Sequence, residues 1–179
     1  MSYEFVKTKK EEGAFIVTLD NPPVNALNMK MMEEIESAIN QANEDQEVIG
    51  VVITGAGSNA FCAGGDIKIM QSIEPEEADK FVNAGHRTFS IVENSSKPVI
   101  AAINGLALGG GNELAMACDL RFASDRARFG QTEVTLGLIP AWGGTQRMLR
   151  LVGKSKSKEL IFSGQMINAQ EALRIGLIN

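Results

Sequence analysis

Cysteine and histidine are scarce in this sequence of 179 residues. It contains two cysteines, Cys62 and Cys118, and a single histidine, His86. The cysteines are far apart and form no CxxC pair, so a zinc site would have to draw most of its ligands from carboxylates. We therefore expect no metal site and two reduced thiols, which are typical of a cytoplasmic protein.

Long apolar runs and a basic surface are also missing. No apolar stretch approaches the roughly 18 residues of a transmembrane helix, and the chain does not open with a basic segment followed by an apolar one. The formal net charge is −5, whereas a protein that binds duplex nucleic acid needs a basic stripe. We expect a cytoplasmic protein that binds neither nucleic acid nor a membrane.

Three familiar site motifs are excluded by reading positions. The glycines at 109–111 do not extend to GxGxxG, because position 114 is a leucine. The segment Gly153-Lys154-Ser155 resembles the end of a phosphate loop, but Met148 stands where that loop needs its first glycine. No GxSxG nucleophile elbow occurs. The remaining candidates for chemistry are glycine loops and carboxylates.

What the chain does contain is an alternation of strand and helix patterns. Its composition, 44% hydrophobic and 22% charged, suits one globular domain over 1–179. Few hairpin signals interrupt the alternation, which favours an α/β fold with parallel strands. The strands are expected at 14–19, 48–54, 99–103 and 120–123, and the helices at 29–43, 75–93, from the glycines at 109–111 to 117, 143–152, 154–162 and 169–175.

The triple glycine Gly109-Gly110-Gly111 follows an expected buried strand and opens an expected helix. Glycine backbone N–H groups at a helix N-terminus are unpaired and accessible to a ligand oxygen. Glu113 stands in the first turn of that helix, so we expect its carboxylate to lie near those donors. In the alternative interpretation, Glu113 only complements the helix dipole and the glycines serve tight packing.

A second glycine loop, AFCAGGDI at 60–67, repeats this arrangement. By itself it is compatible with an ordinary strand-to-helix turn capped by Asp66. Two such loops after two parallel strands can each place one N–H on a shared oxygen, which is the geometry of an oxyanion hole. Glu133, in FGQTE at 129–133, would give a second carboxylate for proton transfer, although alone it would be interpreted as a surface residue.

Taken together, these blocks resemble the enoyl-CoA hydratase/isomerase (crotonase) family. The resemblance extends in order over essentially the whole chain and implies an α/β fold built as a spiral of β-β-α turns, with largely parallel sheets, that binds acyl-CoA thioesters. The matching blocks are NPPVNALN at 21–28, FCAGGDIK at 61–68, INGLALGGGNELAMACDLRFA at 103–123, FGQTEVTLGLIPAWGGTQRM at 129–148 and GQMINAQEALRIGLIN at 164–179.

The resemblance also implies roles for individual residues. The N–H groups of Gly65 and Gly110 would hold the thioester oxygen, and Glu113 and Glu133 match the two catalytic carboxylates of hydratases. The implied reaction is hydration of trans-2-enoyl-CoA to 3-hydroxyacyl-CoA in fatty-acid or related acyl-CoA metabolism, with no cofactor, because CoA is part of the substrate. The implied contacts with CoA are Ala26, Ala63, Gly65, Asp66, Ile67, Lys68 and Gly110.

Two other activities are compatible with the same sequence. A Δ3-Δ2-enoyl-CoA isomerase needs the same oxyanion hole but only one carboxylate. A non-catalytic or RNA-associated relative would keep the fold, although the negative net charge and both glutamates count against it.

The end of the sequence differs from the family pattern. Full-length members continue past GLIN with helices that close the acyl pocket and build trimers or hexamers, so we expect a core domain without that trimerisation segment. We also expect slow hydration, and either self-association through an uncovered apolar region or poor stability of the chain alone. That region comprises Leu136, Leu138, Ile139, Trp142, Met148 and Leu149.

Overall fold

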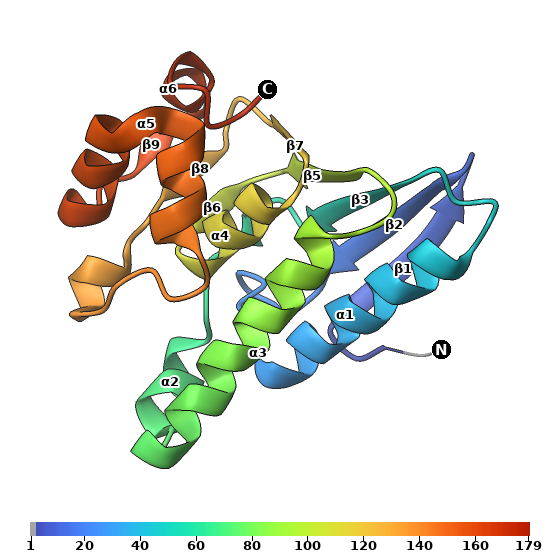
Figure 1. Cartoon of the computed structure of the whole chain (residues 1–179), viewed down its shortest axis with the longest axis horizontal. Coiled ribbons are helices and arrows are strands. Elements are labelled where there is room, and N and C mark those ends of the chain that lie inside the picture. Colours follow the sequence, from blue (N-terminus) through green and yellow to red (C-terminus); the bar gives the residue numbers. More distant parts are fainter. Residues whose placement is uncertain (1–2) are drawn as a thin grey trace.

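The computed structural model describes residues 3–179, which form two β-sheets with helices packed around them (Figure 1). The larger sheet has the strand order β1-β2-β3-β5-β7. Strands β1 and β2 are antiparallel, and the other neighbouring pairs are parallel. Its strands are β1 (Val6–Glu11), β2 (Ala14–Leu19), β3 (Gly50–Gly55), β5 (Val99–Ile103) and β7 (Leu120–Ala123).

The smaller sheet has the strand order β4-β6-β8-β9. Its first two pairs are parallel, and β9 closes it in the antiparallel direction. The strands are short, with bounds β4 (Ala60–Cys62), β6 (Leu106–Leu108), β8 (Arg128–Gly130) and β9 (Ile167–Asn168).

The two sheets are connected by a repeated β-β-α turn. Strands β3 and β4 lead to α2 (Ile67–Ser72) and α3 (Pro75–Glu93), and β5 and β6 lead to α4 (Gly110–Ala117). Strands β7 and β8 lead to the 3₁₀ turn η1 (Glu133–Leu136) and to α5 (Gly144–Ser163). This arrangement confirms the expected spiral of β-β-α turns with largely parallel sheets.

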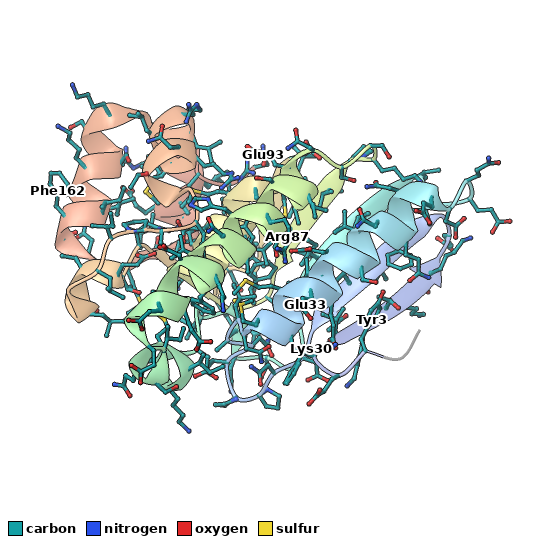
Figure 2. All side chains as sticks on the ribbon, turned by 60° about the horizontal axis from the view of Figure 1, so that its bottom comes forward. Tyr3, Lys30, Glu33, Arg87, Glu93 and Phe162 are labelled. Atoms are coloured by element: carbon teal, nitrogen blue, oxygen red, sulfur yellow. The ribbon has the colours of Figure 1, made fainter. Side chains whose placement is uncertain are left out.

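Helix α1 (Met29–Glu44) covers the larger sheet and lies beside α3 (Figure 1). It begins at Asn28, whose side chain accepts a hydrogen bond from the Met31 amide at 2.8 Å, a capping contact that favours helix initiation. Its buried face includes Ile35 and Ile39. Arg87, labelled on α3 in Figure 2, forms an ion pair with Glu36 of α1 at 2.9 Å. The last helix is α6 (Ala169–Arg174).

Most of the expected elements are present, but the short strands β4, β6 and β9, like β1 and β8, were not predicted. The bounds of α3, β5 and β7 agree with those predicted. The two helices predicted at 143–152 and 154–162 are confirmed, because α5 is interrupted between them at Gly153, whose φ of 78° and ψ of 165° are not helical. Strand β1 and its hairpin turn at Glu12-Gly13 were not predicted, and the segment ending at Gly130 is strand β8 rather than a loop.

The expected uncovered apolar region is only partly exposed. Leu136, Leu138, Ile139 and Leu149 are exposed, but Trp142 and Met148 are buried. The expectation was wrong for these two residues because Trp142 packs against α3 and Met148 is on the inner side of α5. The exposed part of that region therefore consists of the four apolar side chains named first.

Residues 3–179 contain neither a candidate membrane-spanning helix nor a candidate metal-binding cluster. No helix in this range is long and apolar enough to cross a membrane. No group of three or more histidine, cysteine, aspartate or glutamate side chains in the same range could hold a metal ion.

Candidate active site

A cavity of about 530 Å³ lies between the two glycine loops, α2, α3 and the segment that precedes α5. Four residues singled out from the sequence line it: Gly65, Gly110, Glu113 and Glu133. Most of the other wall is apolar, with side chains that include Ile67, Met70, Phe81, Leu136, Leu138 and Ile139. An apolar cavity with a few polar groups at one place suits a ligand that has an apolar part and one reacting group.

The two glycine loops are packed backbone against backbone. A Cβ on Gly64 would lie 3.1 Å from the Leu108 carbonyl oxygen, and a Cβ on Gly111 would lie 1.9 Å from the Cys62 carbonyl oxygen. Gly64 also has φ of 95°, which side-chain-bearing residues rarely adopt. Glycine at these positions is therefore required for the close approach that brings the two loops to one cavity.

This packing places the amides of Gly65 and Gly110 on neighbouring loops. Gly110 is the first residue of α4, where backbone N–H groups have no partner within the helix. The Gly65 loop is fixed by its neighbours: the Leu27 amide donates to the Gly64 carbonyl at 2.8 Å, and the Asp66 amide donates to the Leu27 carbonyl at 2.9 Å. The Gly65 amide is the donor in neither bond. Both amides can therefore serve a ligand oxygen.

Glu113 is almost completely buried and is held by two backbone amides from a distant part of the chain. Its Oε1 accepts hydrogen bonds from the Trp142 amide at 2.9 Å and from the Gly144 amide at 2.6 Å. The expectation that this carboxylate lies near the donors of its own helix was therefore incomplete, because the amides that bind it lie just before α5 and at its first residue. A helix N-terminus carries positive potential that suits an anionic oxygen.

Glu133 comes from a different element of the chain, as the first residue of η1. Its Oε1 accepts a hydrogen bond from Gln131 Nε2 at 3.1 Å, and Gln131 in turn accepts one from Asn112 Nδ2 at 2.8 Å. Glu133 Oε2 is buried without a hydrogen-bond partner in the described chain. Glu133 is therefore a held carboxylate with one free oxygen, rather than the surface residue that its local sequence alone would suggest.

The electrostatic environment shifts both carboxyl groups in the same direction. The pKa of Glu113 is raised from 4.5 to about 7, mainly by burial and also by the charge of Glu133, against the lowering effects of the hydrogen bonds from Gly144 and Trp142 and the charge of Arg147. Burial likewise raises the pKa of Glu133. Two buried carboxyl groups with raised pKa values are suited to general acid–base catalysis.

The predicted CoA contacts fall into two groups. Ala63, Gly65, Ile67 and Gly110 line the cavity. Ala26, Asp66 and Lys68 are not among its lining residues. The Asp66 side chain caps α2 by accepting a hydrogen bond from the Lys68 amide at 2.9 Å, as its local sequence suggested, and Lys68 is exposed. Their contacts with CoA stay predictions.

Three residues that support the site, Gln131, Trp142 and Gly144, were not predicted from the sequence. The amides of Trp142 and Gly144 hold Glu113, and the Gln131 side chain holds Glu133. A signal for the first two was present, because AWGG at 141–144 is a third glycine segment that directly precedes a helix. No local pattern indicates Gln131, whose partners are determined by the tertiary fold.

Comparison with known proteins agrees with this geometry. The family model described as "Enoyl-CoA hydratase/isomerase" matches residues 9–179. A short-chain-enoyl-CoA hydratase from Clostridium acetobutylicum is 49% identical over 180 residues, which are 100% of this chain and 69% of that protein. A crotonyl-CoA hydratase from Syntrophomonas wolfei is 47% identical with the same coverage of both chains.

The same similarity extends to solved structures. An enoyl-CoA hydratase from Bacillus anthracis, solved at 1.8 Å resolution, has a TM-score of 0.95 and 41% identity over 98% of this chain and 69% of that chain. The likeness thus covers the β-β-α spiral, both glycine loops and the segments that carry Glu113 and Glu133. From this agreement of sequence, fold and cavity we conclude that the chain belongs to the enoyl-CoA hydratase/isomerase family.

Proposed function

We propose that this chain is a hydro-lyase that adds water to trans-2-enoyl-CoA thioesters and forms 3-hydroxyacyl-CoA. The observation that carries the proposal is the meeting of two carboxyl groups with raised pKa values and two facing glycine loops in one apolar cavity. The named hydratases that are 47% and 49% identical to this chain support the same reaction.

In this mechanism the thioester oxygen lies between the amides of Gly65 and Gly110. Addition of water at C3 moves electrons onto that oxygen, so the transition state resembles an enolate. Two fixed N–H donors stabilise the charge where it develops, and loss of one such donor typically costs roughly 3–4 kcal/mol. The glycines at these loops are explained by this need for exposed amides.

Glu113 is the group that positions the attacking water. Its Oε1 is anchored by two amides, which leaves Oε2 to accept a proton from the water as the C3–O bond forms. Because its pKa is about 7, Glu113 is a stronger base than an exposed glutamate and is still ionised in a substantial fraction of molecules at neutral pH.

Glu133 supplies the proton that C2 gains. Its Oε2 has no partner within the described chain, and its raised pKa favours the protonated form that can donate. The water supplies the hydroxyl that C3 gains, Glu113 takes its proton and Glu133 gives one to C2; proton transfer from Glu113 to Glu133 then restores both groups, so the addition is redox-neutral and needs no redox cofactor. General acid–base catalysis of this kind contributes about 10²- to 10⁴-fold in rate.

The acyl group would occupy the apolar part of the cavity, and we propose short acyl chains as the preferred substrates. The support is the naming of both relatives, one for short-chain enoyl-CoA and one for crotonyl-CoA. The CoA part would extend past α2 towards solvent, where Lys68 is exposed.

The test compares hydration of crotonyl-CoA with isomerisation of a 3-enoyl-CoA. We expect hydration to dominate, and Glu113→Gln and Glu133→Gln each to reduce its kcat by at least about 100-fold while the Kd for acyl-CoA changes only a few-fold. Glu76→Gln, at an exposed position of α3, is the matched control. Isomerisation that exceeds hydration and survives Glu113→Gln would point to the isomerase instead.

A further inference from the structure

Trp142, the only tryptophan in the sequence, contacts both halves of the proposed site. Its amide donates to Glu113, as described above. Its indole ring lies against the two glycine loops: a Cβ on Gly110 would fall 2.4 Å from Cζ3, and a Cβ on Gly65 would fall 3.2 Å from Cη2. The ring therefore fills the space that side chains at both glycines would need.

The opposite part of the ring is supported by α3. A Cβ on Gly85 would fall 2.3 Å from Nε1 and 2.4 Å from Cε2. Phe81 and Phe89 pack edge-on against the indole, with ring centroids at 5.2 and 5.7 Å. With 5% of its surface exposed, Trp142 is wedged between one helix and two loops.

A buried tryptophan at this position carries an energetic cost that a purely apolar side chain would avoid. The indole Nε1 is buried and has no hydrogen-bond partner in the described chain, and a buried unpaired donor is unfavourable. Phenylalanine would avoid this cost, but its single ring is shorter than the indole. The extra length is what allows one side chain to touch Gly85, Gly65 and Gly110 together.

We infer that Trp142 is a positioning residue whose indole sets the separation of the Gly65 and Gly110 amides, with Gly85 as the support behind the ring. The inference rests on the proposed function, since it assigns the indole to the oxyanion hole. Donors in such a site must be held within a fraction of an ångström of the developing charge, and a misplacement of about 1 Å can lower the rate about 100-fold.

The test shifts the indole by a substitution at Gly85, which contacts the ring from α3 and does not line the cavity. In Gly85→Ala the new Cβ overlaps the ring, so the ring must shift towards the two loops. We expect kcat for crotonyl-CoA hydration to fall by about 10- to 100-fold, with KM changed by no more than about threefold. The absorbance shift of bound acetoacetyl-CoA, whose enolate oxygen would enter the hole, should decrease in parallel.

Two further variants separate positioning from general damage to α3. Asn83→Ala, at an exposed position of the same helix, should leave both readouts unchanged. Trp142→Phe should by itself lower kcat and the absorbance shift, because the shorter ring leaves the loops without support. In that background Gly85→Ala should have a smaller effect, since Nε1 and Cε2, the two ring atoms that its Cβ would approach most closely, are gone.

The indole also reports directly on the site. Because it is the one tryptophan, its fluorescence should change as acetoacetyl-CoA binds, with the same midpoint as the absorbance shift. If the unaltered chain hydrates crotonyl-CoA but Gly85→Ala and Trp142→Phe both keep kcat and the absorbance shift within about twofold, the role of Trp142 is overturned. If the unaltered chain neither hydrates crotonyl-CoA nor shifts the absorbance, the proposed function itself fails.

Discussion

Replacing Glu113 by glutamine removes its charge but keeps its shape. The energetic cost of burying that charge can then be measured apart from the proposed role of Glu113 in catalysis. Folding raises the pKa of this carboxyl group from 4.5 to about 7. The folded state therefore holds the proton more tightly than the unfolded state. The stabilisation that this provides is complete below pH 4.5 and is lost as the pH rises through about 7.

The magnitude follows from the size of that change. One pH unit of difference in pKa corresponds to about 1.4 kcal/mol, so ionisation of Glu113 should lower the free energy of unfolding by about 3 kcal/mol between pH 4 and pH 9. Glutamine keeps an oxygen for the amides of Trp142 and Gly144 but does not ionise. The stability of Glu113→Gln relative to the unaltered chain should therefore increase with pH by this amount.

Urea denaturation at a series of pH values measures the difference. With a denaturant slope of about 2 kcal/mol per molar urea, the midpoint of Glu113→Gln should gain about 1.5 M on that of the unaltered chain between pH 4 and pH 9. Glu76→Gln, at an exposed position, should show no such gain. A constant midpoint difference between Glu113→Gln and the unaltered chain over the whole series would refute the reasoning.

Three other predictions concern the same site and the surface beside it. If Glu113 is the base, kcat/KM for hydration should fall as the pH drops below about 7, and a profile that is flat from pH 5 to pH 8 would contradict its assignment. Gln131→Met removes the amide that donates to Glu133 and should lower kcat about tenfold. It also leaves the buried Asn112 Nδ2 without its acceptor, so urea denaturation should show a free energy of unfolding lower by about 1–3 kcal/mol. Ile139→Ser should reduce self-association at micromolar concentration, because Ile139 is the most exposed of the four apolar side chains on that surface. If Ile139→Ser and the unaltered chain sediment alike, this surface does not mediate self-association.

Local sequence patterns were sufficient for the long elements of this fold. Helix α1 has apolar residues at helical spacing and a capping asparagine at its start, and β5 is an apolar run introduced by a proline. These features act within one element, so they could be predicted from the sequence. Strand β1 was missed because most of its side chains are charged and exposed, and pairing with β2 determines its conformation.

The site could be predicted only in part for the same reason. The glycine loops and Glu113 stand out because glycines and a carboxylate are unusual in apolar segments. The partners of Glu113 lie about 30 residues further along the chain, and the burial of Trp142 depends on Gly85 of another helix. Such contacts between distant segments have no local signal, so the support of the site was identified only in the three-dimensional structure.

The close packing of the two glycine loops also protects a thiol. Cys62 lies at the junction, where its carbonyl oxygen faces Gly111, and burial raises the pKa of its thiol to about 12. At neutral pH the reactive thiolate is therefore present in only about one molecule in 10⁵ while the loops are packed. Alkylating reagents should reach Cys62 only when the junction opens. The rate of Cys62 alkylation therefore measures how often the two loops separate, and bound acyl-CoA should lower that rate.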